Sequence, residues 1–205
     1  MTMPAQLQFD ALTHTYRHNG APLESVTQVL ARAGQIVAWG DEEDLRRGSY
    51  VHKAAALYDR GSLDFRRVAA EWRGFVYAWR NWKRDSGFKV QIIETPVFDA
   101  EHGIAGTPDR IGLLEAFKGV RVVVDLKSNK AGQIADAVRY QLAAYAMLVR
   151  RTPGERLERV GLALMPDGKY SVKHFPMDSL LADWAQFLDW KNGGNNGNGN
   201  GNNGD

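Results

Sequence analysis

Two aspartates and a lysine are the residues of this chain whose types and spacing could do chemistry together. Asp109 closes a Gly-Thr-Pro-Asp turn, and Asp125 and Lys127 stand at the end of the largely apolar run 122–126. Hard divalent cations prefer oxygen ligands such as carboxylates. A cation held by both aspartates, with the lysine beside it, could activate water and offset the charge of a phosphate. The three residues could thus form a site where a divalent cation and a scissile phosphate meet.

A buried strand must hold the second aspartate and the lysine. The run 122–126 reads Val-Val-Val-Asp-Leu, which predicts a strand inside the protein. Side chains alternate along a strand, so Asp125 and Lys127 share one face. A buried carboxylate needs a partner, and a cation shared with Asp109 would supply it. Taken alone, the three residues are better explained by ordinary hydrogen bonds at a turn and at a solvated strand end.

Two further motifs extend the pattern. His52 follows Gly-Ser-Tyr-Val, and Gln141 and Tyr145 are four positions apart, which places them on one face of a predicted helix. The order histidine, G-x-x-D, D-x-K, Q-x-x-x-Y resembles that of the PD-(D/E)XK nuclease superfamily, and within it the RecB-like and phage exonuclease branch. The resemblance covers residues 45–150.

The resemblance implies an α/β fold with a restriction-endonuclease-like core. Its central mixed sheet would have about four or five strands, flanked by helices, with the site at one edge of the sheet. Mg²⁺ or Mn²⁺ is the implied cofactor, and an imidazole ligand suits Mn²⁺ better. The metal ligands would be His52, Asp109, Asp125 and the backbone carbonyl of Leu126, with Glu94 as a second-tier candidate. The catalytic residues would be Lys127, Asp125, Asp109, Gln141 and Tyr145.

Several of these residues also have structural interpretations. His52 precedes three alanines and could be a structural histidine of its helix, and Gln141 and Tyr145 could only pack their helix. Lys130 and Arg139 lie closest in sequence to the site, so we expect them to contact DNA phosphates. The other basic residues mostly form solvated faces.

The function predicted from these motifs is a divalent-metal-dependent DNA nuclease, with an exonuclease of phage-type recombination, replication or repair favoured. A structure-specific or sequence-specific endonuclease on the same site is the first alternative. A catalytically degenerate DNA-binding module is the second. A homo-oligomer or a recombination partner protein also stays open.

The sequence outside these motifs predicts the helices, strands and turns that surround them. A hairpin at 7–23, with Asn19-Gly20 as its turn, is an accessory element, and Ser25 with Gln28 forms a capping box. Expected helices cover 42–58, 64–83, 135–149 and 179–190, and expected strands cover 91–98, 103–114, 120–127, 160–165 and 169–175. Residues 1–191 would form a single nuclease domain, followed by a disordered Asn/Gly-rich tail at 192–205.

Composition narrows the class of protein. At 205 residues with 44% apolar residues, the chain can bury a substantial core, and its net charge of +2 excludes a basic wrapping protein. The absence of cysteine excludes disulfides and an iron–sulfur cluster on Cys ligands. No apolar run has the length of a membrane helix, and the first residues do not resemble a signal peptide. We therefore expect a cytoplasmic protein that does not enter a membrane.

Overall fold

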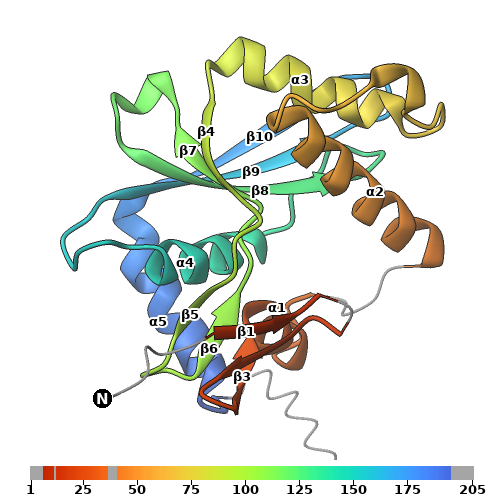
Figure 1. Cartoon of the computed structure of the whole chain (residues 1–205). Coiled ribbons are helices and arrows are strands. Elements are labelled where there is room, and N and C mark those ends of the chain that lie inside the picture. The colour runs from red at the N-terminus through yellow and green to blue at the C-terminus, as the bar shows by residue number, and fades with distance from the viewer. Residues whose placement is uncertain (1–6, 12, 37–40, 195–205) are drawn as a thin grey trace, which may run out of the picture.

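The computed structural model describes residues 7–11, 13–36 and 41–194 (Figure 1). The strands are β1 (Leu7–Asp10), β2 (Thr15–His18), β3 (Ala21–Ser25), β4 (Lys89–Ile93), β5 (Val97–Asp99), β6 (Ile104–Gly106), β7 (Arg110–Leu113), β8 (Arg121–Ser128), β9 (Leu157–Leu164) and β10 (Tyr170–Phe175). The α-helices are α1 (Val26–Arg32), α2 (Glu42–Asp59), α3 (Arg73–Ser86), α4 (Val138–Leu148) and α5 (Leu180–Lys191).

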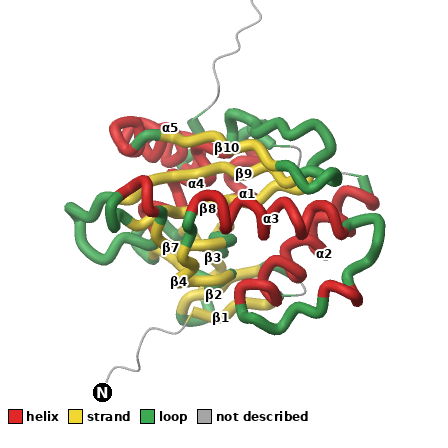
Figure 2. The backbone as a smooth tube through the Cα atoms, turned by 90° about the horizontal axis from the view of Figure 1, so that it is seen from above, coloured by secondary structure: helices red, strands yellow, loops and turns green. Residues whose placement is uncertain are grey.

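A five-stranded mixed sheet forms the centre of the molecule, in the order β10-β9-β8-β7-β4. Strand β8 is parallel to β9, and the other neighbouring strands are antiparallel. Helices α2 and α3 cover one face, and α4 and α5 cover the other (Figure 1). Seen from above, β8, β9 and β10 run side by side (Figure 2). The predicted α/β architecture with a central mixed sheet is confirmed.

Alternation along β8 divides its side chains between two cores. Val122, Val124 and Leu126 pack with Trp79 and other apolar residues of α2 and α3. Val123 packs into the second core with α4 and α5. The predicted phase of this strand is therefore confirmed. Because β8 is the middle strand of the sheet, Asp125 and Lys127 do not lie on an edge strand. The sequence could not show that β9 and β10 would add beyond β8.

A second sheet has the order β1-β2-β3-β6-β5. It contains the predicted N-terminal hairpin, whose Asn19-Gly20 turn has the positive φ values, 52° and 82°, that a tight primed turn requires. The predicted capping box at the start of α1 is also present, because Ser25 and Gln28 each accept a backbone N–H of the other. Parallel pairing of β3 with β6 joins this N-terminal part to the rest of the sheet.

The predicted strand 91–98 is wrong as one continuous strand, whereas 103–114 is interrupted at the Gly-Thr-Pro-Asp turn as expected; in both cases the two parts belong to different sheets. Strand β4 belongs to the central sheet and β5 to the second sheet, with a bend at Glu94, whose φ is 42°. Strands β6 and β7 are divided in the same way around Thr107, Pro108 and Asp109. A proline in each bend lacks the N–H that a continuing ladder would need. The two bends lie together, since the Glu94 N–H donates to the carbonyl of Asp109 at 3.1 Å.

The predicted helix 64–83 begins later than expected. Residues Phe65–Arg67 form a 3-10 turn, and α3 starts only at Arg73. Val68 has an extended backbone, and the N–H of Ala69 donates to the Tyr50 hydroxyl at 2.7 Å. A tertiary contact thus replaces helical hydrogen bonds in this segment. Of the predicted disordered tail, residues 195–205 lie outside the described part of the chain.

Candidate active site

Four elements bring the predicted site residues together. Strand β8 carries Asp125 and Lys127, and Asp109 immediately precedes β7, its antiparallel neighbour. His52 lies on α2, which covers one face of the sheet, whereas Gln141 lies on α4 on the opposite face. The site therefore forms where both helices meet the carboxyl end of β8.

Asp109 and His52 meet around the backbone of Leu126. The Leu126 N–H donates to Asp109 Oδ2 at 2.6 Å. His52 Nδ1 lies 3.3 Å from Asp109 Oδ1, and His52 Nε2 lies 3.0 Å from the Leu126 carbonyl oxygen. The imidazole thus connects two of the predicted metal ligands.

Lys127 bridges the other carboxylate and helix α4. Its ammonium lies 3.0 Å from Asp125 Oδ1, 2.9 Å from Asp125 Oδ2 and 3.2 Å from Gln141 Oε1. The Asp125 side chain is 3% exposed, whereas that of Lys127 is 39% exposed. The carboxylate is therefore enclosed while the ammonium reaches the surface of the site. This is the arrangement expected from the strand phase of Asp125 and Lys127.

Tyr145 packs against the glycine of the Gly-Thr-Pro-Asp turn. A Cβ at Gly106 would lie 2.6 Å from Tyr145 Cε1, so any side chain at this position would displace the ring. Tyr145 is one helical turn beyond Gln141, and burial raises the pKa of its phenol. The phenol is therefore a neutral neighbour of the site at ordinary pH.

Glu94 approaches the site through its backbone, but its carboxylate faces another residue. Glu94 Oε1 accepts from Arg110 NH1 at 3.3 Å, and the same nitrogen donates to the Asp109 carbonyl oxygen at 2.6 Å. Arg110 also donates from Nε to Asp59 Oδ2 at 2.6 Å, and both of these side chains are fully buried. This pair was not predicted from the sequence. The sequence does contain one sign of it, because a charged residue, Arg110, begins a buried strand directly after Asp109.

The charges of the cluster influence one another. Burial alone would lower the pKa of His52, but the carboxylate of Asp109 outweighs this effect and raises it. Burial opposes ionisation of Asp109, yet the His52 charge and its hydrogen bond lower the pKa of Asp109. Burial raises the pKa of Asp125 against the opposing effect of Lys127. Burial would lower the pKa of Lys127, but Asp125 and Asp109 raise it, so the lysine keeps its proton.

The donor set fits a divalent cation. It contains two carboxylates, the Leu126 carbonyl and an imidazole, which are ligands for Mg²⁺ or Mn²⁺. Asp125 Oδ2 is buried and has no hydrogen bond of good geometry among the described residues, although the Lys127 ammonium lies 2.9 Å away. A buried oxygen with spare acceptor capacity is what a cation would satisfy. The donor types in this cluster are therefore those that a divalent cation would use.

A second group of possible metal ligands lies close together elsewhere in the structure. Within the described ranges, the ligand atoms of Asp99, Glu101 and His102 all lie within 4.8 Å of one another. The cluster sits in the connection between β5 and β6, and Asp99 already accepts hydrogen bonds from both of the other residues. These partners explain the arrangement without a metal.

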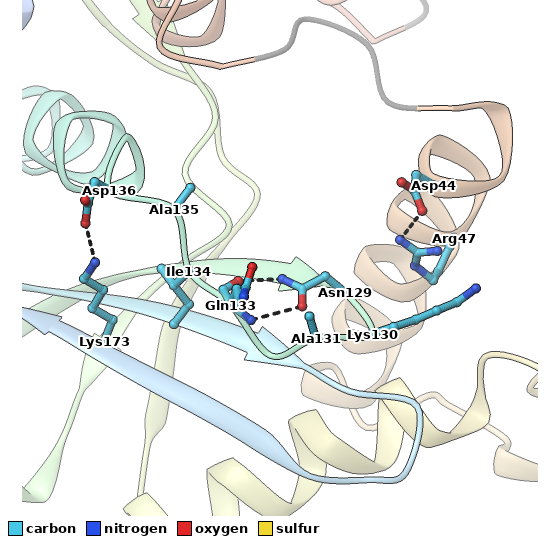
Figure 3. A pocket seen from close by; sticks show the side chains of 10 residues that line it. All are labelled: Asp44, Arg47, Asn129, Lys130, Ala131, Gln133, Ile134, Ala135, Asp136 and Lys173. Carbon is cyan, nitrogen blue, oxygen red and sulfur yellow. Dashed lines mark hydrogen bonds and ion pairs between the residues drawn. The ribbon is translucent and has the colours of Figure 1, made fainter.

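A basic groove adjoins the site (Figure 3). Its volume is about 840 Å³, and the cationic side chains that line it are Arg47, Lys130 and Lys173. A neighbouring cavity of about 390 Å³ shares Arg47 with the groove and reaches His52 and Lys127. Arg47 donates to the carbonyl of Ser128 at 3.1 Å and is nearly buried, so it differs from the solvated residue expected from the sequence.

The two predicted DNA contacts occupy different surroundings. Lys130 lines the basic groove and is exposed, with Glu43 at 3.6 Å. Arg139 instead donates to Asp183 of α5 at 2.9 Å and lines neither the groove nor its neighbouring cavity. The structure therefore brings Lys130 toward the site and assigns Arg139 a contact between α4 and α5.

Comparison with known proteins agrees with this architecture. The PD-(D/E)XK nuclease superfamily profile matches residues 63–190. A candidate exonuclease from Eubacterium rectale is 19% identical, with 85% of this chain and 83% of that chain covered and a TM-score of 0.51. An alkaline exonuclease from Laribacter hongkongensis is 13% identical, with 82% and 85% covered and a TM-score of 0.44. No curated protein matches the sequence significantly.

The match extends over more than half of the sequence and includes the bend at Asp109, strand β8 and helix α4. The similarity to the Eubacterium rectale structure independently shows the fold. The chain belongs to the PD-(D/E)XK nuclease superfamily.

Proposed function

We propose that this protein is a divalent-metal-dependent DNA exonuclease that hydrolyses phosphodiester bonds in phage-type recombination, replication or repair. One observation carries the proposal: Asp109, Asp125 and Lys127 converge at one end of β8, with a buried oxygen of Asp125 left without a well-formed hydrogen bond. The superfamily match supports nuclease chemistry at this position.

The side chains would divide the work of hydrolysis. Asp109, Asp125 and the Leu126 carbonyl would hold Mg²⁺ or Mn²⁺, with His52 as a further ligand. The bound cation would supply charge that activates water and neutralises the phosphate. Lys127, which keeps its proton, would orient the attacking water and stabilise the negative charge on the phosphate. Gln141 holds the lysine in place through their 3.2 Å contact, and water would attack directly, without a covalent enzyme intermediate.

The basic groove supports a nucleic acid substrate. Phosphate contacts dominate the affinity of proteins for DNA, and Arg47, Lys130 and Lys173 lie along a groove that adjoins the site. Acidic residues also occur there, including Asp44 and Asp136, which pair with Arg47 and Lys173. A DNA strand in the groove would have to compete with these ion pairs.

The decisive experiment compares end-labelled linear DNA with covalently closed circular DNA, in Mg²⁺, in Mn²⁺ and with a chelator. Metal-dependent loss of linear DNA alone is the expected result, and the labelled end would give the direction of digestion. Cutting of the circle would assign an endonuclease instead. Absence of cleavage with every metal, together with retained DNA binding, would favour a catalytically degenerate DNA-binding module.

A further inference from the structure

A second cavity is lined by Gly106 of the Gly-Thr-Pro-Asp turn and shares no lining residue with the basic groove. Its volume is about 380 Å³. We call it the hydroxyl pocket, because hydroxyl groups of Tyr16, Ser25, Thr27 and Tyr145 belong to residues that line it. Gln28 and Gly106 also line the pocket. Strands β2 and β3, helix α1, the end of β6 and helix α4 supply these residues. The pocket therefore joins the N-terminal sheet to the nuclease core.

The chemistry of the hydroxyl pocket differs from that of the basic groove. Among the described residues that line it, none is Asp, Glu, Lys or Arg, and His14 supplies an imidazole. Burial raises the pKa of Tyr16, so its phenol stays neutral. A phosphate would find no formal cation there. Hydroxyl, amide and aromatic groups instead suit a planar, uncharged ring with several hydrogen-bonding atoms.

The wall of this pocket is also part of the active site. The Tyr16 hydroxyl lies 2.8 Å from the Thr107 hydroxyl, two residues before Asp109. Gly106 and the Tyr145 ring are packed so closely that a Cβ on the glycine would lie 2.6 Å from the ring. Tyr145 is one helical turn beyond Gln141, which accepts from Lys127. An occupant of the pocket would thus lie against Gly106 and Tyr145, which are near Asp109 and Gln141 in the chain.

We infer that the hydroxyl pocket receives one nucleobase of the strand being cut, while the phosphates of that strand follow the basic groove. The inference rests on the proposed function and adds the position of a base to it. Small-molecule pockets usually have volumes of about 300–1,000 Å³. A cavity of about 380 Å³ therefore accommodates a single base but not a duplex. A base held there would fix the strand against sliding past the site.

The test combines abasic substrates with a variant that fills the pocket. Linear DNA substrates carry a single abasic position at successive nucleotides from the labelled end. Cleavage is measured with the wild-type protein, with Ala31→Trp and with Ala21→Trp. Ala31 lines the pocket on α1, whereas Ala21 is exposed on β3 and does not line it. Thermal unfolding confirms that each variant is folded.

The wild-type protein and Ala21→Trp should cleave about tenfold more slowly when one particular position is abasic, because losing a stacked base usually costs about this much. Ala31→Trp should be slow on intact DNA and indifferent to that abasic position. Equal wild-type rates at every abasic position would overturn the inference. An undiminished response of Ala31→Trp to the abasic site would overturn it as well.

A binding measurement separates failure of this inference from failure of the proposed function. Oligonucleotides with 2-aminopurine at successive positions are titrated in chelator, so that no cleavage occurs. A position-specific fluorescence change with wild-type protein, absent in Ala31→Trp, supports the base pocket even if no nuclease activity is found. Cleavage without any position-specific change would leave the nuclease assignment intact and refute the base pocket.

Discussion

Of the two carboxylates at the candidate site, Asp125 is the more deeply buried, with a side chain that is 3% exposed against 15% for Asp109. Its carboxylate is almost completely buried, yet one oxygen lacks a well-formed hydrogen bond. A buried acceptor left unsatisfied costs about 1–3 kcal/mol. Lys127 offsets part of this cost from 2.9 Å, and a divalent cation would offset the rest. The spare acceptor capacity of this oxygen is what the proposed cation would use.

Replacement of Lys127 by alanine should lower the cleavage rate by about a hundredfold or more, as loss of a charge-stabilising group does in other enzymes. Asp125 would lose the ammonium that offsets its burial, so some stability should be lost, but the protein should stay folded and still bind DNA. Lys169→Ala is the matched control, since Lys169 is exposed and pairs only with Asp167 among the ion pairs of the described residues. Unchanged cleavage by pure Lys127→Ala would refute the site assignment.

Gly106→Ala should destabilise the protein by about 1–3 kcal/mol, the usual cost of overpacking a core. The new methyl group would lie 2.6 Å from Tyr145 Cε1 and 3.3 Å from Val26 Cγ2. Urea denaturation measures the change in the free energy of unfolding. Gly154→Ala is the control, because nothing lies within 4 Å of a Cβ at that position. An equal effect of both substitutions would show that the contact with Tyr145 is not responsible.

The elements around the site are held together by buried charges. Arg110 at the start of β7 binds Asp59 at the end of α2, and Asp59 also accepts from Lys83 and Trp79 of α3. Arg110 in turn donates to the carbonyl of Asp109. This chain of contacts ties the position of a predicted metal ligand to the packing of two helices.

Asp59→Ala should reduce the free energy of unfolding by about 3–5 kcal/mol, because Arg110 would lose its buried carboxylate partner and keep only the longer, 3.3 Å contact with the partly exposed Glu94. Cleavage should also decrease, since Arg110 would no longer be fixed beside Asp109. Thermal or urea unfolding and a cleavage assay measure the two effects. Asp64→Ala removes an exposed ion pair with Arg66 and should have little effect on either. Comparable losses in both variants would contradict a special role for the buried pair.

The ion pair between Arg121 and Glu155 predicts that the stability of the protein depends on pH. Glu155 accepts from Arg121, at the start of β8, at 2.7 Å. Burial would raise the pKa of Glu155, but the hydrogen bond from Arg121 outweighs it and lowers the pKa below 4.5. The stabilisation is therefore complete above the pKa of the unfolded chain and is lost as the pH falls through the lower pKa of the folded protein.

Glu155→Gln should accordingly be less stable than the wild-type protein at neutral pH, and the difference should shrink in acid. The measurement is the free energy of unfolding of both proteins as a function of pH. A difference that stays constant through the acidic range would show that the charge of Glu155 does not contribute.

At the scale of the whole molecule, the chain passes between the two sheets at two bends. At Glu94 it leaves the central sheet for the second sheet, and at Asp109 it returns to the central sheet. The site lies beside these bends, with the basic groove and the hydroxyl pocket on different walls. Along the described part of the chain, the structure contains no helix long and apolar enough to cross a bilayer.

Metal binding should raise the melting temperature of the whole protein. Ligand at about a hundred times its dissociation constant stabilises a folded protein by about 2.7 kcal/mol. Mn²⁺ or Mg²⁺ should therefore raise the melting temperature of the wild-type protein but not that of Asp109→Ala/Asp125→Ala. Asp99→Ala/His102→Ala tests the other acidic cluster. If only this second variant lost the response, the metal site would have to be reassigned to the β5–β6 connection.

Local sequence determined much of this protein. The alternation along β8 put Asp125 and Lys127 on one face, the Asn19-Gly20 pair specified a tight turn, and Ser25 specified the start of α1. These features depend on neighbours in the chain, so periodicity and side-chain chemistry suffice to predict them. The order of the motifs likewise indicated the superfamily, whose sequence profile matches the chain.

Tertiary structure decided which distant residues meet. Nothing in the sequence around Arg139 indicates that it binds Asp183 rather than facing DNA, or that Arg110 and Asp59 form a buried pair. The division of each long strand between two sheets depended on contacts between the bends. Such contacts join segments far apart in the chain. They can stabilise the protein only once the sheets and helices have packed together. The hydroxyl pocket has the same origin, because its walls come from separate elements.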